Sequence, residues 1–224
     1  MNGKAYLAEF IGTFALIFIG AGSIVAAPLA ASGLVGVALA HGLTIAVMVS
    51  ATAAVSGGHL NPSVTVGFLL TGRIGPADAL GYIVSQCLGG IAAAALLLAL
   101  LPAQARAAAV GVTALADGVS PLSGLLIEAV LTFFLMFVIY GTAADRRAPK
   151  VGGLFIGLTI ALDILMGGSF TGGAMNPARH LGPALFAGTA FTAQLWIYWL
   201  GPILGASAAA LIYAGVLEGK TDGE

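Results

Sequence analysis

Long apolar stretches are the feature that most limits the folds open to this chain. Of its 224 residues 59% are hydrophobic and 8% are charged, whereas soluble domains usually carry about 25% charged residues. Six stretches approach or exceed the roughly 20 mostly apolar residues that an α-helix needs to cross a bilayer. They are residues 5–26, 34–56, 79–101, 121–144, 151–168 and 190–216. The chain is therefore predicted to be an all-α membrane protein with six transmembrane helices in a lipid bilayer.

Charge and chemistry-bearing residues exclude several other classes. A formal net charge of −1, without any long basic run, leaves nothing to bind nucleic acid. Cys87 is the only cysteine, so an intrachain disulfide or a thiolate metal cluster cannot form. The chain has neither a nucleophile elbow nor a His-Glu-x-x-His zinc motif. We expect no enzyme activity, no cofactor and no metal site.

The basic residues indicate an orientation. If the first residue is internal, all but two of them fall on the inner side, and Arg106 alone lies on an outer loop while Arg179 lies within the apolar region. The inner residues are Lys4, Arg73, Arg146, Arg147, Lys150 and Lys220. Because Lys and Arg concentrate in cytoplasmic loops, we expect a multi-pass protein of the cell membrane with both termini in the cytoplasm.

The two halves of the chain repeat each other. Residues 56–63, Ser-Gly-Gly-His-Leu-Asn-Pro-Ser, align with residues 171–178, Thr-Gly-Gly-Ala-Met-Asn-Pro-Ala, at an offset of 115. Glu9 corresponds to Glu128 at an offset of 119, each followed by a phenylalanine-rich run. Self-similarity of this kind indicates a repeated structural unit.

The repeat predicts one domain over residues 1–224, with a first repeat over about 1–101 and a second over about 121–217. Each half contains three spans, an odd number, so the second half must enter the membrane from the opposite face. Inverted repeats of this kind build a site near the middle of the bilayer.

Two shorter apolar segments, residues 61–71 and 176–187, open with Asn61-Pro62 and Asn176-Pro177. Each is too short to span a hydrocarbon core of about 30 Å. Asn is a favoured helix N-cap and Pro is favoured at the first helical position, so each segment is predicted to be a half-length helix. Each N-terminus carries free N–H groups and an effective charge of about +0.5. Two such ends at the midplane would repel cations, while a neutral molecule could accept hydrogen bonds from the asparagine amides.

The chain resembles the aquaporin (major intrinsic protein) family across nearly its whole length. The residues that carry the resemblance are Asn61-Pro62-Ser63, Asn176-Pro177-Ala178-Arg179, Ala8-Glu9-Phe10-Ile11-Gly12-Thr13 and Ser56-Gly57-Gly58-His59. The resemblance implies a right-handed bundle of six helices and two re-entrant half-helices, one pore per subunit, and usually a homotetramer. Ser63 stands where most members have Ala, which implies altered local packing without loss of the pore.

The resemblance also assigns a selectivity constriction. Arg179 has Val64 as its counterpart in the first half, and an arginine at membrane depth nearly always faces a cavity or a partner. Alignment to the family adds His41, Ile164 and Gly173 to Arg179. This quartet is similar to that of plant tonoplast intrinsic proteins, some of which pass water together with ammonia. The expected function is a passive channel for water and small neutral solutes including ammonia, which excludes protons and ions.

Several neighbouring residues are expected to support the pore. By resemblance, Glu9 and Glu128 accept hydrogen bonds from the half-helix loops, and His59 lines the inner pore. Asp163, beside Ile164, is hypothesised to orient His41 or Arg179 by a hydrogen bond, or to form a salt bridge with Arg179. No role is predicted for His180.

Other functions remain open at this stage. A filter widened at Gly173 would suit larger neutral solutes, such as glycerol or metalloid hydroxides like arsenous acid. A secondary transporter can also use inverted repeats and broken helices, but it would normally need an acidic coupling-ion site at the midplane. A structural membrane protein with a closed pore is a third alternative.

Overall fold

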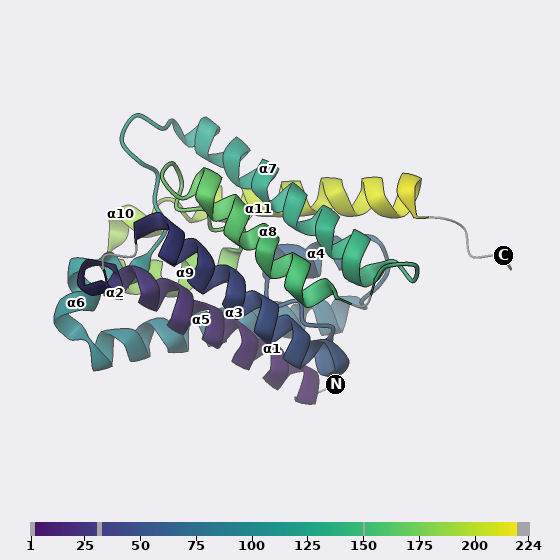
Figure 1. Cartoon of the computed structure of the whole chain (residues 1–224), viewed down its shortest axis with the longest axis horizontal. Helices are drawn as coiled ribbons and strands as arrows, with labels where there is room; N and C mark the ends of the chain where they lie inside the picture. Colours follow the sequence, from purple (N-terminus) through teal and green to yellow (C-terminus); the bar gives the residue numbers. More distant parts are fainter. Residues whose placement is uncertain (1–2, 31–32, 150, 219–224) are drawn as a thin grey trace, which may run out of the picture.

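The structure, a computed structural model, describes residues 3–30, 33–149 and 151–218, and its regular elements there are all helical. In chain order the elements are α1 (Gly3–Ala15), η1 (Leu16–Ala21), α2 (Gly22–Ala30), α3 (Gly33–Ser56), α4 (Pro62–Leu70), α5 (Pro76–Leu100), α6 (Pro102–Ala107), η2 (Ala109–Gly111), α7 (Pro121–Ile139), η3 (Tyr140–Ala144), α8 (Gly152–Gly167), α9 (Pro177–Ala187), α10 (Thr189–Thr192), α11 (Leu195–Ile212) and η4 (Tyr213–Leu217). The long helices α1, α3, α8 and α7 lie side by side and slant across the view, while α11 runs roughly along the long axis (Figure 1).

Five helical stretches in the described residues are long and apolar enough to cross a membrane. They are Gly3–Pro28, Gly33–Ser56, Pro76–Leu100, Pro121–Ala144 and Thr189–Leu217. The sixth predicted span, 151–168, forms α8, which has 16 residues and is about 24 Å long. It is shorter than a full span because the chain leaves the helix at Gly167 and turns through residues 168–171 towards the second half-helix.

The long helices pack in repeat-related pairs. Helix α3 packs on its repeat counterpart α8. The α7–α11 pair in the second half corresponds to the α1–α5 pair in the first, and α1 also packs against α3. The α3–α8 crossing is close because glycines face each other: a Cβ atom at Gly157 would lie 2.3 Å from the backbone oxygen of Gly42. Small residues permit such approach between helices in lipid. The start of α1 and the end of η4 lie at the same end of the bundle (Figure 1).

The two predicted half-helices are present as α4, with 9 residues, and α9, with 11. Helix α4 packs on α5 and α11, and α9 packs mainly on α5. Pro62 and Pro177 occupy the first turns, where a missing N–H costs no hydrogen bond. The all-α prediction with two short re-entrant segments is therefore confirmed.

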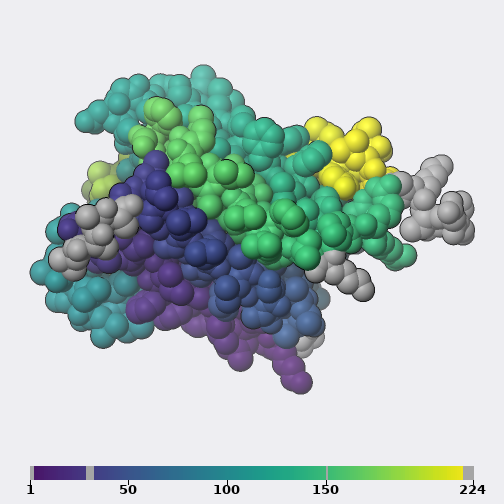
Figure 2. Space-filling view, viewed as in Figure 1, coloured from purple at the N-terminus to yellow at the C-terminus, as the bar shows by residue number. Residues whose placement is uncertain are grey.

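Large apolar side chains cover the outside of the bundle. Leu39, Leu43 and Val47 on α3 and Leu158 and Leu162 on α8 are exposed, and the outer surfaces of α1, α3 and α8 lie beside one another in Figure 2. Soluble proteins rarely expose apolar patches of this extent. This apolar surface is therefore suited to contact with lipid.

Candidate functional site

The two asparagine-capped helices meet head to head in the middle of the molecule. Asn61 Oδ1 accepts a hydrogen bond from the N–H of Ser63 at 2.9 Å, and Asn176 Oδ1 accepts from Ala178 at 3.0 Å and Arg179 at 3.2 Å. Each asparagine amide also donates to the loop that leads into the other helix. Asn61 Nδ2 lies 2.8 Å from Met175 O, and Asn176 Nδ2 lies 2.9 Å from Leu60 O. The two caps thus join the halves reciprocally.

The residue before each asparagine has a strained backbone. Leu60 has φ +50° and Met175 has φ +51°, the left-handed region that residues with a Cβ seldom adopt. Both side chains are fully buried. Side-chain packing and hydrogen bonds to the N–H and C=O groups of both residues hold this conformation. A strained backbone persists only where the surrounding contacts fix it.

Two buried carboxylates hold these loops from behind. Glu9 accepts from Ser56 Oγ at 2.6 Å, from the N–H groups of His59 and Leu60 at 2.9 and 2.6 Å, and from Gln86 Nε2 at 2.7 Å. Both Glu9 and its repeat counterpart are inaccessible to solvent. Without the Glu9 carboxylate, the N–H groups of His59 and Leu60 would have no hydrogen-bond acceptor inside the protein.

Glu128 repeats this arrangement in the second half. It accepts from Thr171 Oγ1 at 2.6 Å and from the N–H groups of Ala174 and Met175 at 3.0 and 2.7 Å. The correspondence extends to two tyrosines, because Tyr82 donates to Ser56 O and Tyr198 to Thr171 O, each at 2.7 Å. The inverted sequence repeat therefore has a matching repeat of polar contacts.

The four residues predicted for the constriction form two contacting pairs. Arg179 Nε donates to His41 Nε2 at 3.2 Å, and His41 Nδ1 donates to the carbonyl of Val37 at 2.8 Å. A Cβ atom at Gly173 would lie 3.4 Å from Cα and Cγ1 of Ile164. All four residues are buried. The guanidinium is thus held by a neutral imidazole ring, since the ring nitrogen that accepts cannot carry a proton.

A cavity of about 1110 Å³ opens from the asparagine pair towards the loops at one end of the bundle. Asn61, Asn176 and His59 line it near the centre, and Arg73 and Arg146 line it near the loops. His59 is partly buried, with Nδ1 3.1 Å from Thr65 Oγ1 and its ring stacked on Phe68 at 4.6 Å between centroids. The cavity gives small molecules access to the midplane from that end.

Comparison with known proteins identifies the family. Residues 1–213 match the family described as Major intrinsic protein. The chain belongs to this family. It is 46% identical to Aquaporin TIP4-4 of Zea mays over 222 residues, which cover 95% of this chain and 86% of that protein. It is 41% identical to Probable aquaporin TIP2-2 of Arabidopsis thaliana over 227 residues, covering 97% and 88%.

The fold of this major intrinsic protein also matches a solved structure. The aquaglyceroporin from Plasmodium falciparum superposes with a TM-score of 0.86 over 97% of both chains, at 22% identity. The predicted resemblance to the aquaporin family and its TIP-type members is therefore confirmed. The chain is a multi-pass membrane channel for water and small solutes, and it is not an enzyme.

One expected contact is absent from this major intrinsic protein. Asp163 forms no hydrogen bond with His41 or Arg179 in the described part of the chain, and its Oδ2 atom is buried without a partner. Both ring nitrogens of His41 are already used, by Val37 and by Arg179. Among the described residues, neither the orienting hydrogen bond nor the salt bridge with Arg179 is therefore present.

Two residues of the site, Gln86 and Gly20, have little signal in the sequence. Gln86 gives Glu9 a fourth donor that Glu128 lacks, and its only sequence signal is a polar side chain in the middle of an apolar span. Gly20 lies in the π-helical turn η1, where a Cβ atom would be 2.5 Å from Cδ2 of His41. π-Helical turns are frequent at functional sites, but a glycine in a glycine-rich chain gave no signal of this contact.

Proposed function

We propose that this chain is a passive channel for water together with ammonia that excludes protons and other ions. The supporting observation is the head-to-head meeting of α4 and α9 at Asn61 and Asn176. Each helix N-terminus contributes about half a positive charge, which disfavours a cation at this point. An asparagine amide has two hydrogens. One of them binds the opposite loop, so the second remains for a passing neutral molecule in the cavity that both residues line.

We assign selection to His41, Ile164, Gly173 and Arg179. The fixed charge of Arg179, with its fork of donors, repels cations and binds neutral polar solutes. Ile164 and Gly173 offer no hydrogen-bonding side chain on their part of the wall, and Gly173 occupies little volume. Such a wall suits ammonia, which needs fewer hydrogen-bond partners than water does.

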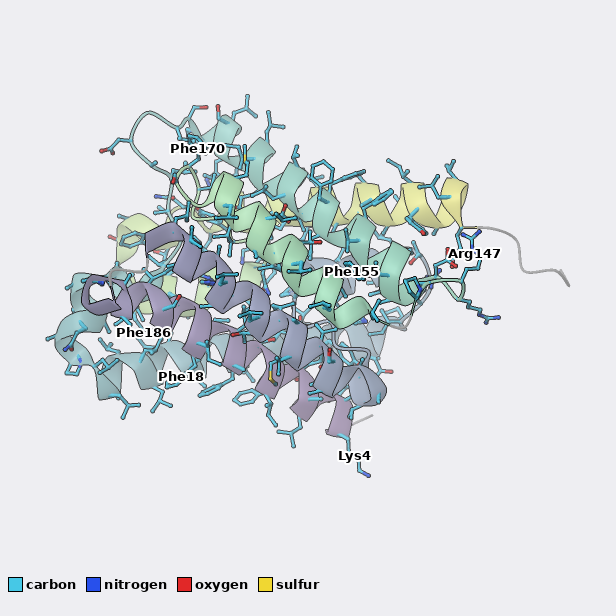
Figure 3. The ribbon with its side chains drawn as sticks, in the orientation of Figure 1. Lys4, Phe18, Arg147, Phe155, Phe170 and Phe186 are labelled. Atoms are coloured by element: carbon cyan, nitrogen blue, oxygen red, sulfur yellow. The ribbon has the colours of Figure 1, made fainter. Side chains whose placement is uncertain are left out.

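We further propose a homotetramer in the cell membrane with cytoplasmic termini, and a single domain built from repeats over about 1–101 and 121–217. The tetramer follows from family resemblance. Lys4 and Arg147 project at the end of the bundle where α1 begins (Figure 3), and Arg73 and Arg146 line the cavity. Lys150 and Lys220 lie outside the described residues. A cytoplasmic location of this basic end satisfies the positive-inside rule.

The test is stopped-flow measurement on vesicles that contain the purified protein, with empty vesicles as the control. Osmotic water flux and ammonia influx are compared between the wild type and the double variant His41→Phe, Ile164→His. The proposal expects fast fluxes of both molecules, with ammonia selectively lost in the double variant. Fast water flux with ammonia influx no greater than in empty vesicles would overturn the ammonia assignment.

Two further readouts separate the alternative functions. Solute flux that stays linear with concentration and is unaffected by ionophores excludes a coupled transporter, whose flux saturates and follows an ion gradient. Influx of glycerol and of arsenous acid, measured in the same vesicles, determines whether the constriction admits larger neutral solutes.

A further inference from the structure

His180, which follows Arg179 in the first turn of α9, is fully buried and contacts three separate parts of the outer region. Its Nε2 donates to the carbonyl of Phe191 at 3.2 Å, and its Nδ1 lies 2.8 Å from Thr113 Oγ1. Its ring stacks on Tyr198, with centroids 4.0 Å apart and planes at 16°. Because a carbonyl only accepts, the neutral ring carries its proton on Nε2 and accepts from the Thr113 hydroxyl at Nδ1.

Thr113 belongs to the long loop between α6 and α7, which lies against the second half-helix loop. The N–H of Ala116 donates to Phe170 O at 2.9 Å, and the N–H of Leu115 donates to Gln194 Oε1 at 3.1 Å. Thr113 is 1% exposed. The segment 112–116 is therefore held by these hydrogen bonds and by the packing of Leu115 against Ala174, Ile197 and Tyr198.

The same threonine touches the neighbours of two constriction residues. A Cβ atom at Gly172, which has φ +81°, would lie 2.7 Å from Cγ2 of Thr113, so Thr113 packs directly against the residue before Gly173. Its hydroxyl bonds His180, the residue after Arg179. Thr113 thus contacts Gly172, the residue before Gly173, and His180, the residue after Arg179.

The first half of the chain has a related pair that differs in one important respect. Position 65, the repeat equivalent of His180, is Thr65, and its hydroxyl lies 3.1 Å from Nδ1 of His59. Those two residues belong to one short segment that faces the inner cavity. In the second half the threonine comes from a distant loop, so only the outer pair can tie a separate segment to the half-helix.

We propose that His180 and Thr113 form a clamp that holds the outer loop against residues 170–175 and thereby sets the width of the constriction at Gly173 and Arg179. Both are positioning residues, and the inference rests on the proposed channel function. If the hydroxyl is lost, the imidazole keeps an unpaired acceptor in a buried site. The loop then keeps its bonds at Leu115 and Ala116 but is held less firmly at position 113, and Gly172 and Arg179 gain freedom to move.

The test is Thr113→Val, which keeps the side-chain shape and removes the hydroxyl. Glycerol and water fluxes are measured in vesicles, and hydrogen exchange is followed at the amides of Leu115 and Ala116. We expect the ratio of glycerol to water permeability to rise at least about fivefold and exchange of the two amides to accelerate at least about tenfold, which corresponds to about 1.4 kcal/mol of lost protection. Thr113→Ser, which restores a hydroxyl, is expected to return both values towards the wild type.

Thr159→Val is the matched control, because the hydroxyl of Thr159 donates only to Phe155 O within α8. It removes the same group and is expected to leave the permeability ratio unchanged. A ratio in Thr113→Val equal to that of the wild type overturns the inference, whether or not loop exchange accelerates. Absence of water flux in the wild type would instead overturn the proposed function, so the two failures are distinct.

Discussion

Nε of Arg179 donates a hydrogen bond to Nε2 of His41 over 3.2 Å, while His41 donates its own proton from Nδ1 to Val37 O. The arrangement requires a neutral imidazole, because a second proton on the ring would place two cationic groups in direct contact. His41 therefore holds the guanidinium without cancelling its charge. The single positive charge of Arg179 remains available to repel cations.

Replacing Arg179 by Val is expected to admit protons and small cations. The substitution removes a full charge from a buried position, where electrostatic interactions are screened much less than in water. We expect the proton leak of vesicles at a fixed membrane potential to rise at least about tenfold, equivalent to a barrier lowered by about 1.4 kcal/mol. A pH-sensitive dye inside the vesicles measures the leak. Arg179→Lys keeps the charge and should keep the exclusion, and an unchanged leak in Arg179→Val would contradict the role of Arg179.

Glu9→Gln and Glu128→Gln are expected to destabilise the half-helix loops unequally. Each Glu9 oxygen accepts two donors, whereas one oxygen of Glu128 accepts only Met175 N. In a glutamine, an NH2 group replaces one carboxylate oxygen and faces the donors that this oxygen accepted. At position 9 it faces two donors whichever oxygen it replaces, whereas at position 128 it can replace the oxygen that accepts only from Met175 N. With about 1.5–3 kcal/mol for each hydrogen bond to a charged group, we expect losses of about 3–6 kcal/mol for Glu9→Gln and about 1.5–3 kcal/mol for Glu128→Gln.

Thermal unfolding in detergent measures these losses, and reconstituted water flux confirms that the surviving protein is folded. The order matters more than the absolute values, since both variants remove one charge and change no volume. Equal stability of Glu128→Gln and the wild type would show that the second-half loop does not depend on its carboxylate.

The sequence predicts the elements of the midplane because their determinants are local. An asparagine followed by proline specifies a helix start by its own chemistry, and the offset of 115 between Asn61 and Asn176 predicts that the two starts are equivalent. Nothing local predicts the positive φ of Leu60 and Met175. Leucine and methionine resist that conformation, and only contacts between the two halves stabilise it.

Contacts made by single polar side chains in apolar helices were the least predictable part of the site. Asp163 is next to Ile164 in sequence, yet Ile164 lies beside Gly173 whereas the Oδ2 atom of Asp163 is buried without a hydrogen-bond partner. Adjacent residues on a helix point about 100° apart, so proximity in sequence does not give a shared partner. Likewise the contact of Thr113 with His180 joins residues 67 apart in sequence, across a loop without periodicity.

Gly205→Ala is expected to disrupt the packing of α7 on α11. A Cβ atom at Gly205 would lie 1.9 Å from the backbone oxygen of Ala129 and 2.9 Å from the N–H nitrogen of Phe133. Backbone atoms cannot rotate away as a side chain can, so the helices must separate. We expect a loss of about 2–3 kcal/mol, in the range typical of overpacking, measured by thermal unfolding. Gly215→Ala is the control, because a Cβ atom there meets nothing within 4 Å; equal stability of the two variants would contradict the prediction.

The loop after η3 is tied to the end of the final helix. Asp145 accepts from the backbone N–H of Arg147 at 2.9 Å and from its Nε at 3.0 Å, and Arg147 Nη2 donates onward to Leu217 O at 3.1 Å. The Arg147 guanidinium holds the pKa of the Asp145 carboxyl well below its usual value. The ionised pair therefore links the loop beside the cavity to the end of η4.

A carboxyl whose pKa is lower in the folded state than in the unfolded state stabilises the fold at pH values above the unfolded pKa. That contribution declines as the pH falls through the folded pKa. Asp145→Asn is therefore expected to melt at a lower temperature than the wild type by the same margin at pH 7 and pH 5, both above the unfolded pKa of about 3.9. The margin should shrink at pH 3. Melting curves of the two proteins at the three pH values test this, and a margin that stays constant down to pH 3 would show that Asp145 acts as a neutral hydrogen-bond acceptor.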